Sequence, residues 1–327
     1  MKTPATKRFC TLLWMLLWLI AAGLQGCSLE DDRDLCCRGM MSMQYVYRPY
    51  GQDQIMDYIT SLRHYLYTDG GDFVCELPPG ADFRYQPLDL PEGSYAMVTV
   101  GNSTERATTL GHRDGAQSLD ALRLDHIDRH TPAGPHFGNT DELYWGAKRF
   151  VVDADGKAVG IGRSAWDDAG MVTQMNNIHC HLRVKVEWSN APPYIGTYDM
   201  ELEGVATGYS LHPDRASEAE GFIVPRGDNR STHRISVPLR SRELDGEFVT
   251  LRYEDGRLPV LRILFGGEKV SPDIDLAKAF KEWGLHPSRT HVQKYKLLLQ
   301  LRSDGSAFLY PSLDGSIEDW IDGGSFG

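Results

Sequence analysis

The sequence has few positive charges for its length. Its 327 residues include 34 lysines and arginines against 45 aspartates and glutamates, so the formal net charge is −11 at pH 7. Binding to nucleic acid or to anionic lipid headgroups depends on clustered cations that neutralise phosphates. The composition therefore argues against nucleic acid and against an anionic lipid surface as direct partners.

Organised catalytic motifs are also missing. Gly160-Ile161-Gly162 lacks the later glycine and the lysine with which a phosphate-binding loop cradles its ligand. Asp167 and Asp168 could serve a glycosidase as a carboxylate pair, but adjacent acids arise by chance in an acidic protein. The sequence therefore predicts a protein that is not an enzyme and that needs no cofactor.

Cysteines are scarce, and beyond Cys27 only Cys36, Cys37, Cys75 and Cys180 remain. In an exported protein one or two disulfides are plausible, and four cysteines allow three pairings. Adjacent cysteines on an extended chain point to opposite sides, so Cys36 and Cys37 should face different partners. A bridge from either of them to Cys75 is the preferred prediction, and free buried thiols are the alternative.

A long uncharged apolar run occurs at the N-terminus. Residues 9–24 carry no charge and follow Lys2, Lys7 and Arg8, which is the layout of a secretory signal. A spanning helix needs about twenty apolar residues with anchoring charges beyond them. Here small residues lead into an acidic tract at 30–34, made of Glu30, Asp31, Asp32 and Asp34 around Arg33. The sequence favours a cleaved signal over a retained transmembrane anchor.

The apolar run ends in Leu24-Gln25-Gly26-Cys27, which resembles a bacterial lipobox. In a lipobox a diacylglyceryl group is attached to the cysteine thiol before cleavage in front of that cysteine. The acidic tract at 30–34 resembles the surface-export signal of Bacteroidales lipoproteins. We therefore predict a signal peptide at 1–26, lipidation of Cys27, an acidic tether at 27–35 and a location at the outer membrane. The alternative to lipidation is an ordinary cleavage site with an incidental cysteine. The alternative to the export signal is a solvated tether that happens to be acidic.

Short strands fill the rest of the chain. Apolar residues alternate with polar ones, which indicates antiparallel strands with one buried face. Asp-Gly pairs, typical of hairpin turns, begin at positions 69, 114, 155, 245, 255, 304, 314 and 322. This density of strands and turns predicts an all-β protein of sandwiches or barrels. The alternating segments are residues 41–47, 182–188, 198–202, 235–239, 249–253 and 295–301.

Only two helices are predicted, and both should cover sheets. One spans residues 53–60, and the other lies within 271–284, with Ser271 or Asp273 as its N-cap and Gly284 at its end. Pro238 within an alternating run predicts an edge strand. The least patterned stretch, residues 160–177, places a domain boundary near 175, giving domains at 36–175 and 176–327.

Three groups of residues invite a functional interpretation. His179-Cys180-His181 puts two imidazoles on one face of a strand, but nothing nearby has the spacing of a third metal ligand, so no metal is predicted. Asp153 and Asp155 lack the closing glutamate of a calcium loop and indicate a hairpin turn. Trp166 and Trp320, set among acidic residues, are candidates for contact with a glycan or a partner protein.

Several segments together resemble the Bacteroidales fimbrial anchor family, the lipoproteins described as major or minor fimbrium anchoring subunits. After the lipobox cysteine come Asp34-Leu35-Cys36 and then "MQYVYRPY". Asp57-Tyr58-Ile59 leads into "LRHYLYTDGGDFV", and "LPEGSYAMVTVGN" (90–102) and "NNIHCHLRVKVEW" (176–188) are similar to later strands of the family.

This resemblance implies two tandem transthyretin-like β-sandwich domains and no catalytic residue. It also implies a protein that holds a fimbrium to the outer membrane, sometimes limits fimbrial length and contacts fimbrial shaft subunits. Strand addition to an open sheet edge is the expected mode of contact. A surface lipoprotein that binds glycan is the alternative interpretation.

Overall fold

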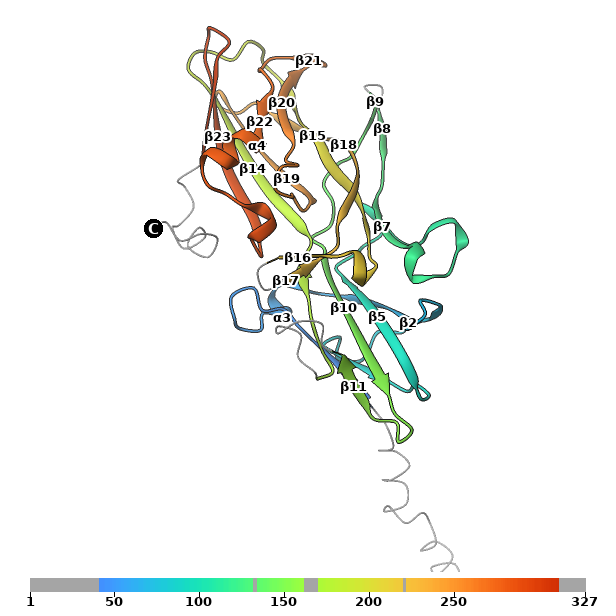
Figure 1. Ribbon diagram of the computed structural model, residues 1–327. Coiled ribbons are helices and arrows are strands. Elements are labelled where there is room, and N and C mark those ends of the chain that lie inside the picture. The colour runs from blue at the N-terminus through green and yellow to red at the C-terminus, as the bar shows by residue number, and fades with distance from the viewer. Residues whose placement is uncertain (1–40, 132–133, 162–169, 220–221, 312–327) are drawn as a thin grey trace, which may run out of the picture.

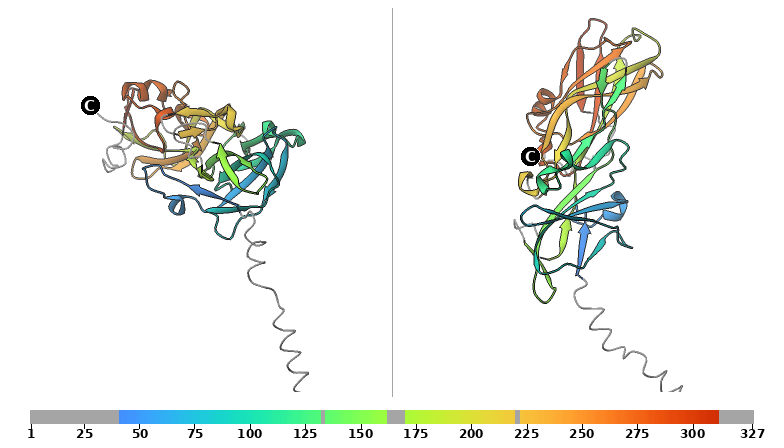
Figure 2. Two further views of the ribbon diagram at one scale, coloured as in Figure 1. Left: turned by 60° about the horizontal axis from the view of Figure 1, so that its bottom comes forward. Right: turned by 90° about the vertical axis from the view of Figure 1, so that its right-hand side faces the viewer.

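Strands dominate the computed structural model, which describes residues 41–131, 134–161, 170–219 and 222–311. This confirms the predicted all-β class. The molecule is elongated, with strand β11 (Ala158–Ile161) at one end and strand β21 (Glu268–Lys269) at the other (Figures 1 and 2). Two α-helices occur in the described residues, together with short 3-10 turns: η1 (Arg113–Gly115), η2 (Leu119–Ala121), η3 (Pro213–Arg215) and η4 (Pro287–Arg289).

A six-stranded and a three-stranded sheet form the end that contains β11. The six-stranded sheet has the order β11, β10 (Tyr144–Val152), β5 (Gly93–Gly101), β2 (Leu62–Thr68), β3 (Phe73–Leu77), and β13 (Asn176–Asn177) also pairs with β10. The three-stranded sheet has the order β12 (Val172–Gln174), β1 (Met41–Val46), β4 (Tyr85–Leu88). A first core packs between them and includes Met43, Tyr45, Leu66, Met97, Phe150 and Met175.

The other end is built from a four-stranded and a seven-stranded sheet. The four-stranded sheet has the order β19 (Glu243–Leu251), β14 (His179–Trp188), β23 (Gln293–Leu301), β24 (Ala307–Pro311). The other has the order β21, β20 (Val260–Phe265), β15 (Thr197–Ser210), β7 (Leu122–His126), β6 (Thr108–His112), and β18 (Gly227–Pro238) and β22 (Ile274–Asp275) pair with β15 and β20. A last core lies between these sheets and includes Leu182, Val184, Met200, Phe248, Leu297 and Leu299.

Strand β15 connects the two ends of the molecule. Residues 199–203 pair with β20, whereas residues 208–210 pair with β7, which precedes the predicted boundary at 175. A bulge at Gly204, whose φ of 88° favours glycine, separates the two parts. Between the ends lies a middle core, which includes Val98, Leu124, Trp145, Ile178, Tyr209 and Leu251. The chain before and after residue 175 therefore shares one sheet and one core.

The middle core explains why strand β5 is apolar on both faces. Tyr95 and Met97 face the first core, while Ala96, Val98 and Val100 face the middle core. A strand buried on both faces is selected for a continuous apolar run rather than for alternation. The run "YAMVTV" at residues 95–100 has this pattern.

Both helices form, in shorter versions than the sequence suggested. Helix α3 (Ile55–Tyr58) lies within the predicted 53–60. Helix α4 (Leu276–Glu282) begins later than predicted because Asp275 is its N-cap, accepting hydrogen bonds from the backbone N–H of Ala277 and Lys278. The predicted cap Ser271 instead accepts a hydrogen bond from Ile263 N. Gly284, with a φ of 69°, follows the helix as predicted.

The predicted strands form, and three of the eight Asp-Gly pairs are confirmed as hairpin turns, while the pairs at 314 and 322 lie outside the described residues. The Asp-Gly pairs at 69, 155 and 304 connect β2 to β3, β10 to β11 and β23 to β24. Pro238 is the last residue of β18, which pairs with β15 as its one partner strand among the described strands. Two small hairpins, β8 (Arg129–Thr131) with β9 (Gly134–His136) and β16 (Ser217–Ala219) with β17 (Phe222–Val224), complete the described strands.

The alternation predicted at residues 249–253 is confirmed in part, because Leu251 and Tyr253 are buried as expected. Val249 was expected inside, but Phe248 enters the last core and Val249 is half-buried on the opposite face. The inward position Gly246 carries no apolar side chain, while Val249 is covered because Asn139 and Thr140 bond to its backbone. The predicted Asp-Gly turn at 245 is also wrong, because Gly246 lies within this strand.

Candidate functional site

The sequence-predicted site residues fall into two groups. Cys75 and the His179-Cys180-His181 cluster are described, and five others lie outside the described residues: Cys27, Cys36, Cys37, Trp166 and Trp320. Lipidation, the disulfide and the tryptophan contacts therefore stay predictions. In the part of the chain that is described, no helix is long and apolar enough to cross a membrane.

Cys75 lies on β3, an outer strand of the six-stranded sheet, and packs against the first core. Partial burial raises the pKa of its thiol, because desolvation penalises the thiolate. At neutral pH the thiol form is therefore favoured. A bridge from Cys75 to Cys36 or Cys37 is not tested by these contacts.

The outer strand β24 presents an open edge with aromatic side chains. Among the described strands it pairs with β23 alone, in antiparallel register. Leu309 packs against the last core, whereas Phe308 and Tyr310 are 37% and 41% exposed. The guanidinium of Arg302 lies 4.0 Å from the centre of the Phe308 ring. An edge that no described strand pairs with, next to exposed apolar side chains, is a template for an added strand.

A second open edge lies on β11, at the opposite end of the molecule (Figure 1). Val159 and Ile161 on β11 and Val151 on β10 are exposed, and Val151 lies directly opposite Val159. The turn between these strands is held by Asp153, whose carboxylate accepts hydrogen bonds from the backbone N–H of Asp155 and Lys157. This confirms the predicted hairpin. The described residues thus offer a candidate partner-binding edge at each end.

The histidine cluster lies where the two ends meet. His179 and His181 point to the face of β14 opposite Cys180, which is buried in the last core. His179 is buried, and desolvation lowers its pKa to about 3, so the imidazole is neutral. Glu142, from the segment before β10, brings an oxygen to 3.4 Å from His181 Nε2. Glu142 therefore supplies the third group that the local sequence did not reveal.

Beside this cluster, Arg252 is buried and forms no ion pair with a carboxylate of the described residues. Its guanidinium donates hydrogen bonds to the backbone carbonyls of Asn177, Pro287, Thr290 and His291. Burial lowers its pKa from the usual range because the charged form loses hydration. Arg252 thus ties the end of β13 to the loop before β23. No sequence motif marked this arginine, because its hydrogen bonds to the described residues go to backbone carbonyls.

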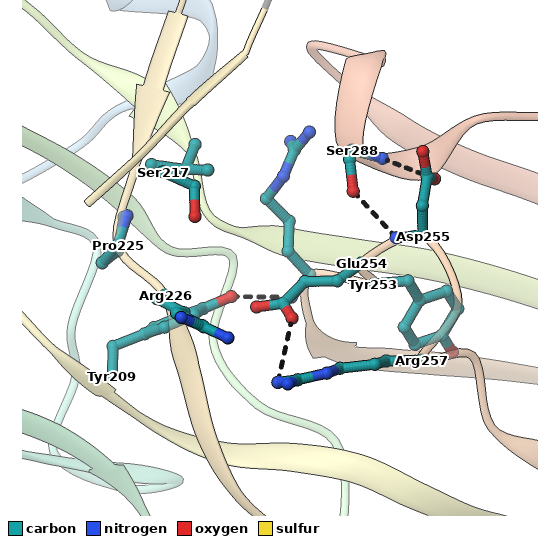
Figure 3. Close-up of a pocket in the computed structure, with 11 residues that line it drawn as sticks. Tyr209, Ser217, Pro225, Arg226, Tyr253, Glu254, Asp255, Arg257 and Ser288 are labelled. Atoms are coloured by element: carbon teal, nitrogen blue, oxygen red, sulfur yellow. Dashed lines mark hydrogen bonds and ion pairs between the residues drawn. The ribbon is translucent and has the colours of Figure 1, made fainter. Parts of the chain in front are cut away.

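A small pocket of about 280 Å³ opens next to Arg252, between the β16–β17 hairpin and the segment after β19 (Figure 3). Its lining combines apolar side chains such as Val224 and Pro225 with charged ones. Glu254 points toward Arg257, whose Nη1 lies 3.6 Å from its carboxylate, and Asp255 and Ser288 exchange hydrogen bonds at the rim. The volume suits a small polar group rather than a large apolar ligand.

Comparisons with known proteins relate the chain to fimbrial anchor proteins. The family model of fimbrillin-A associated anchor proteins Mfa1 and Mfa2 matches residues 36–321. The structure is similar to that of the fimbrial anchor protein Mfa2 from Porphyromonas gingivalis, at 13% identity and a TM-score of 0.54 over 84% of this chain and 95% of that one. No curated protein matches the sequence in a direct comparison.

Two structures from Bacteroides thetaiotaomicron are also similar. One, described as a candidate polysaccharide-binding protein, is 12% identical with a TM-score of 0.57 and covers 84% of this chain and 99% of that one. The other, described as a candidate adhesin, is 14% identical with a TM-score of 0.54 and covers 83% and 95%. At these identities the likenesses establish the fold alone.

Proposed function

This chain belongs to the family of fimbrillin-A associated anchor proteins, and from that premise we propose that it fixes a fimbrium to the outer membrane. The family is one of fimbrial anchor proteins and not of enzymes. The family match over residues 36–321 is the observation that carries the proposal. In the proposed role, acyl chains on Cys27 hold the protein to the membrane, and one sheet edge binds a fimbrial shaft subunit.

The lipid would supply the fixed base that a fibre under drag requires. Each buried methylene contributes about 0.8 kcal/mol, so two or three acyl chains make release slow. The acidic tract at 30–34 would keep the tether solvated between the membrane and the first sheet. Such a base subunit would also end the fimbrium at the membrane, and in this way limit its length.

Strand addition would supply the contact with the shaft. Backbone hydrogen bonds give affinity in this mode, and alternate side chains select the partner. Strand β24 is the preferred edge because Phe308 and Tyr310 are exposed at alternate positions. It also belongs to the end opposite the one that contains β1, the first described strand after the tether (Figure 1).

Substitution of Cys27 tests the lipid. Cys27→Ala should give a folded protein that is released or misprocessed, with fimbriae shed into the medium. Fractionation of cells into membrane and soluble material measures this, together with mass spectrometry of the mature N-terminal peptide. Unchanged membrane fractionation of the variant, or a native peptide without acyl chains, would contradict lipid anchoring.

The binding edge is tested separately by capture of a fimbrial shaft subunit. Phe308→Lys with Tyr310→Lys places two charges beside the β24 edge and should reduce capture at least 10-fold. Val159→Lys with Ile161→Lys makes the same change at the β11 edge and serves as the matched control. Loss of capture in the β11 variant instead would move the contact to that edge. Full capture by both variants would argue against strand addition at either one.

Glycan binding is a second candidate function, favoured by the pocket lined by Glu254, Asp255 and Arg257. Retention on a glycan array or an affinity gel tests it. Loss of retention on substitution of Trp166, Trp320 or Glu254 would support this function. Absence of retention alongside stoichiometric capture of a fimbrial subunit would leave the anchor as the proposed function.

A further inference from the structure

We propose that Glu142, His179 and His181 form a binding site for a divalent transition metal ion, with Zn²⁺ as the best match. One ligand atom from each of the three residues lies within 4.8 Å of the others. Two imidazoles and one carboxylate are a ligand set that zinc accepts, with water completing the coordination. The anchoring role assigns no such site.

The two imidazoles come together because they alternate on one strand. His179 and His181 lie two residues apart on β14, so their side chains share a face. Their rings meet edge to face with centroids 5.2 Å apart. Glu142 reaches them from the segment that precedes β10, and its Oε1 lies 3.4 Å from His181 Nε2. The three groups therefore come from two segments that are distant in sequence.

Hydrogen bonds at the other ring nitrogen support this assignment most strongly. His179 Nδ1 lies 2.9 Å from the carbonyl oxygen of Leu143, and His181 Nδ1 lies 2.8 Å from Glu247 Oε1. Both neighbours are pure acceptors, so each Nδ1 carries a proton, and in a neutral ring Nε2 then keeps the lone pair that a metal requires. Metal-binding histidines are typically oriented in this way, by a carbonyl or a carboxylate at the second nitrogen.

Asn177 lies close to His179 without occupying that lone pair. Its Nδ2 is 3.2 Å from Nδ1 and 3.2 Å from Nε2 of His179. The two ring nitrogens direct their bonds away from each other, so an atom equidistant from both is aligned with neither. His179 Nε2 thus remains available as a ligand.

The charges around the cluster also favour a divalent cation. Glu142 and Glu247 contribute two negative charges beside His181, which a dication would balance. The alternative is that a protonated His181 pairs with both carboxylates and no metal binds. In that alternative, the hydrogen bond between His179 Nδ1 and the carbonyl oxygen of Leu143 would not help to position a metal ligand.

A bound ion would fasten the junction between the two ends of the molecule. Glu142 adjoins β10 of the six-stranded sheet, while the histidines and Glu247 belong to β14 and β19 of the four-stranded sheet. A bond through the metal would join these sheets beside the middle core. Because the ion binds the folded state, it should raise the temperature of unfolding.

Zinc titration of the purified chain without a histidine tag tests the proposal. Isothermal titration calorimetry should show one Zn²⁺ per chain, and the unfolding temperature should rise with added zinc. His181→Ala and Glu142→Gln should each weaken binding at least 10-fold, and Glu247→Gln should weaken it about 10-fold by releasing the ring of His181. These side chains are 16%, 54% and 53% exposed, so the variants should fold, which circular dichroism can check.

His286→Ala is the matched control, because His286 also lies near a carboxylate, 3.7 Å from Asp255, but outside the cluster. Its zinc affinity should equal that of the unsubstituted chain. Absence of zinc binding would overturn the proposal in favour of the protonated His181. Zinc binding of unchanged affinity in His181→Ala would overturn it too, by placing the ion elsewhere.

Discussion

The side-chain amide of Gln293 bonds to both backbone groups of Tyr253. Tyr253 N donates to Gln293 Oε1 at 2.7 Å, and Gln293 Nε2 donates to the carbonyl oxygen of Tyr253 at 2.8 Å. The same Nε2 also donates to the carbonyl oxygen of Pro287. Gln293 is fully buried at the start of β23, so its side-chain amide satisfies both backbone groups of Tyr253, which lies outside the described strands.

Replacement of this amide should be costly. Gln293→Leu keeps the approximate volume but leaves the N–H and the carbonyl of Tyr253 without partners, each worth about 1–3 kcal/mol when buried. We expect a loss of about 3 kcal/mol in the free energy of unfolding, measured by denaturant titration. Gln300→Leu, at a half-buried position on the same strand, should change it by less than about 1 kcal/mol. Equal effects of the two substitutions would contradict the role given to Gln293.

Gly146 marks a close approach between β10 and the segment that returns beside it. A Cβ atom at this position would lie 2.8 Å from Thr173 Cγ2 and 2.9 Å from the carbonyl oxygen of Gln174. Because the carbonyl is backbone, the clash cannot be relieved by a rotamer change. Gly146→Ala should therefore destabilise the fold by about 1–3 kcal/mol in thermal or denaturant unfolding.

Gly111 provides the comparison, since it also lies in a strand, β6, but has open space where a Cβ would be added. Gly111→Ala should be neutral or slightly stabilising, because alanine restricts the unfolded chain more than glycine does. If Gly146→Ala were as stable as Gly111→Ala, β10 and residues 173–174 could move apart without loss of stability, which would contradict this prediction.

The sequence was most informative where a strand buries a single face. Strands β14 and β23 pack Leu182, Val184, Leu297 and Leu299 into the last core and turn polar residues outward, so their period of two was visible. The hairpin turn at Asp153 could also be predicted, because its sequence signal is local. In strand β19 only Val249 was assigned to the wrong face, and its backbone is covered by residues 139–140.

Features that depend on distant segments could not be predicted. The pairing of β15 with β7 joins residues about 85 positions apart, and no local pattern specifies it. Glu142 and Glu247 approach His181 from two different segments, so the sequence showed two histidines without their acidic neighbours. Arg252 and Gln293 bond to backbone carbonyls, which every residue carries and which therefore leave no sequence signal.

Stability should fall in mild acid, partly because of His64. Its ring is buried, stacks on Tyr45 and shares a hydrogen bond with Thr99 Oγ1. Desolvation lowers the pKa of His64 from 6.5 to about 4, so between these values the unfolded chain binds a proton that the folded chain does not. The contribution of His64 is therefore complete above pH 6.5 and is lost as the pH falls toward 4, at up to about 1.4 kcal/mol per pH unit.

His64→Gln removes the imidazole that takes up this proton when the chain unfolds. The unfolding free energy of the variant should fall less steeply between pH 6.5 and 4 than that of the parent chain, by up to about 1.4 kcal/mol per pH unit. Chemical denaturation at several pH values measures the two slopes. Parallel curves would show that His64 takes up its proton while the protein remains folded.

For Arg252, the cost of desolvating the guanidinium charge opposes the stabilisation from its hydrogen bonds. Arg252→Met removes the buried cation but strands the carbonyls of Asn177, Thr290 and His291, and hydrogen bonds to a charged donor contribute about 1.5–3 kcal/mol each. Since several bonds are lost for one charge, we expect destabilisation by about 3 kcal/mol in denaturant unfolding. Arg257→Met makes the same change at an exposed ion pair and should cost less than about 1 kcal/mol. An Arg252→Met protein as stable as Arg257→Met would mean that burial of the charge costs as much as its bonds contribute.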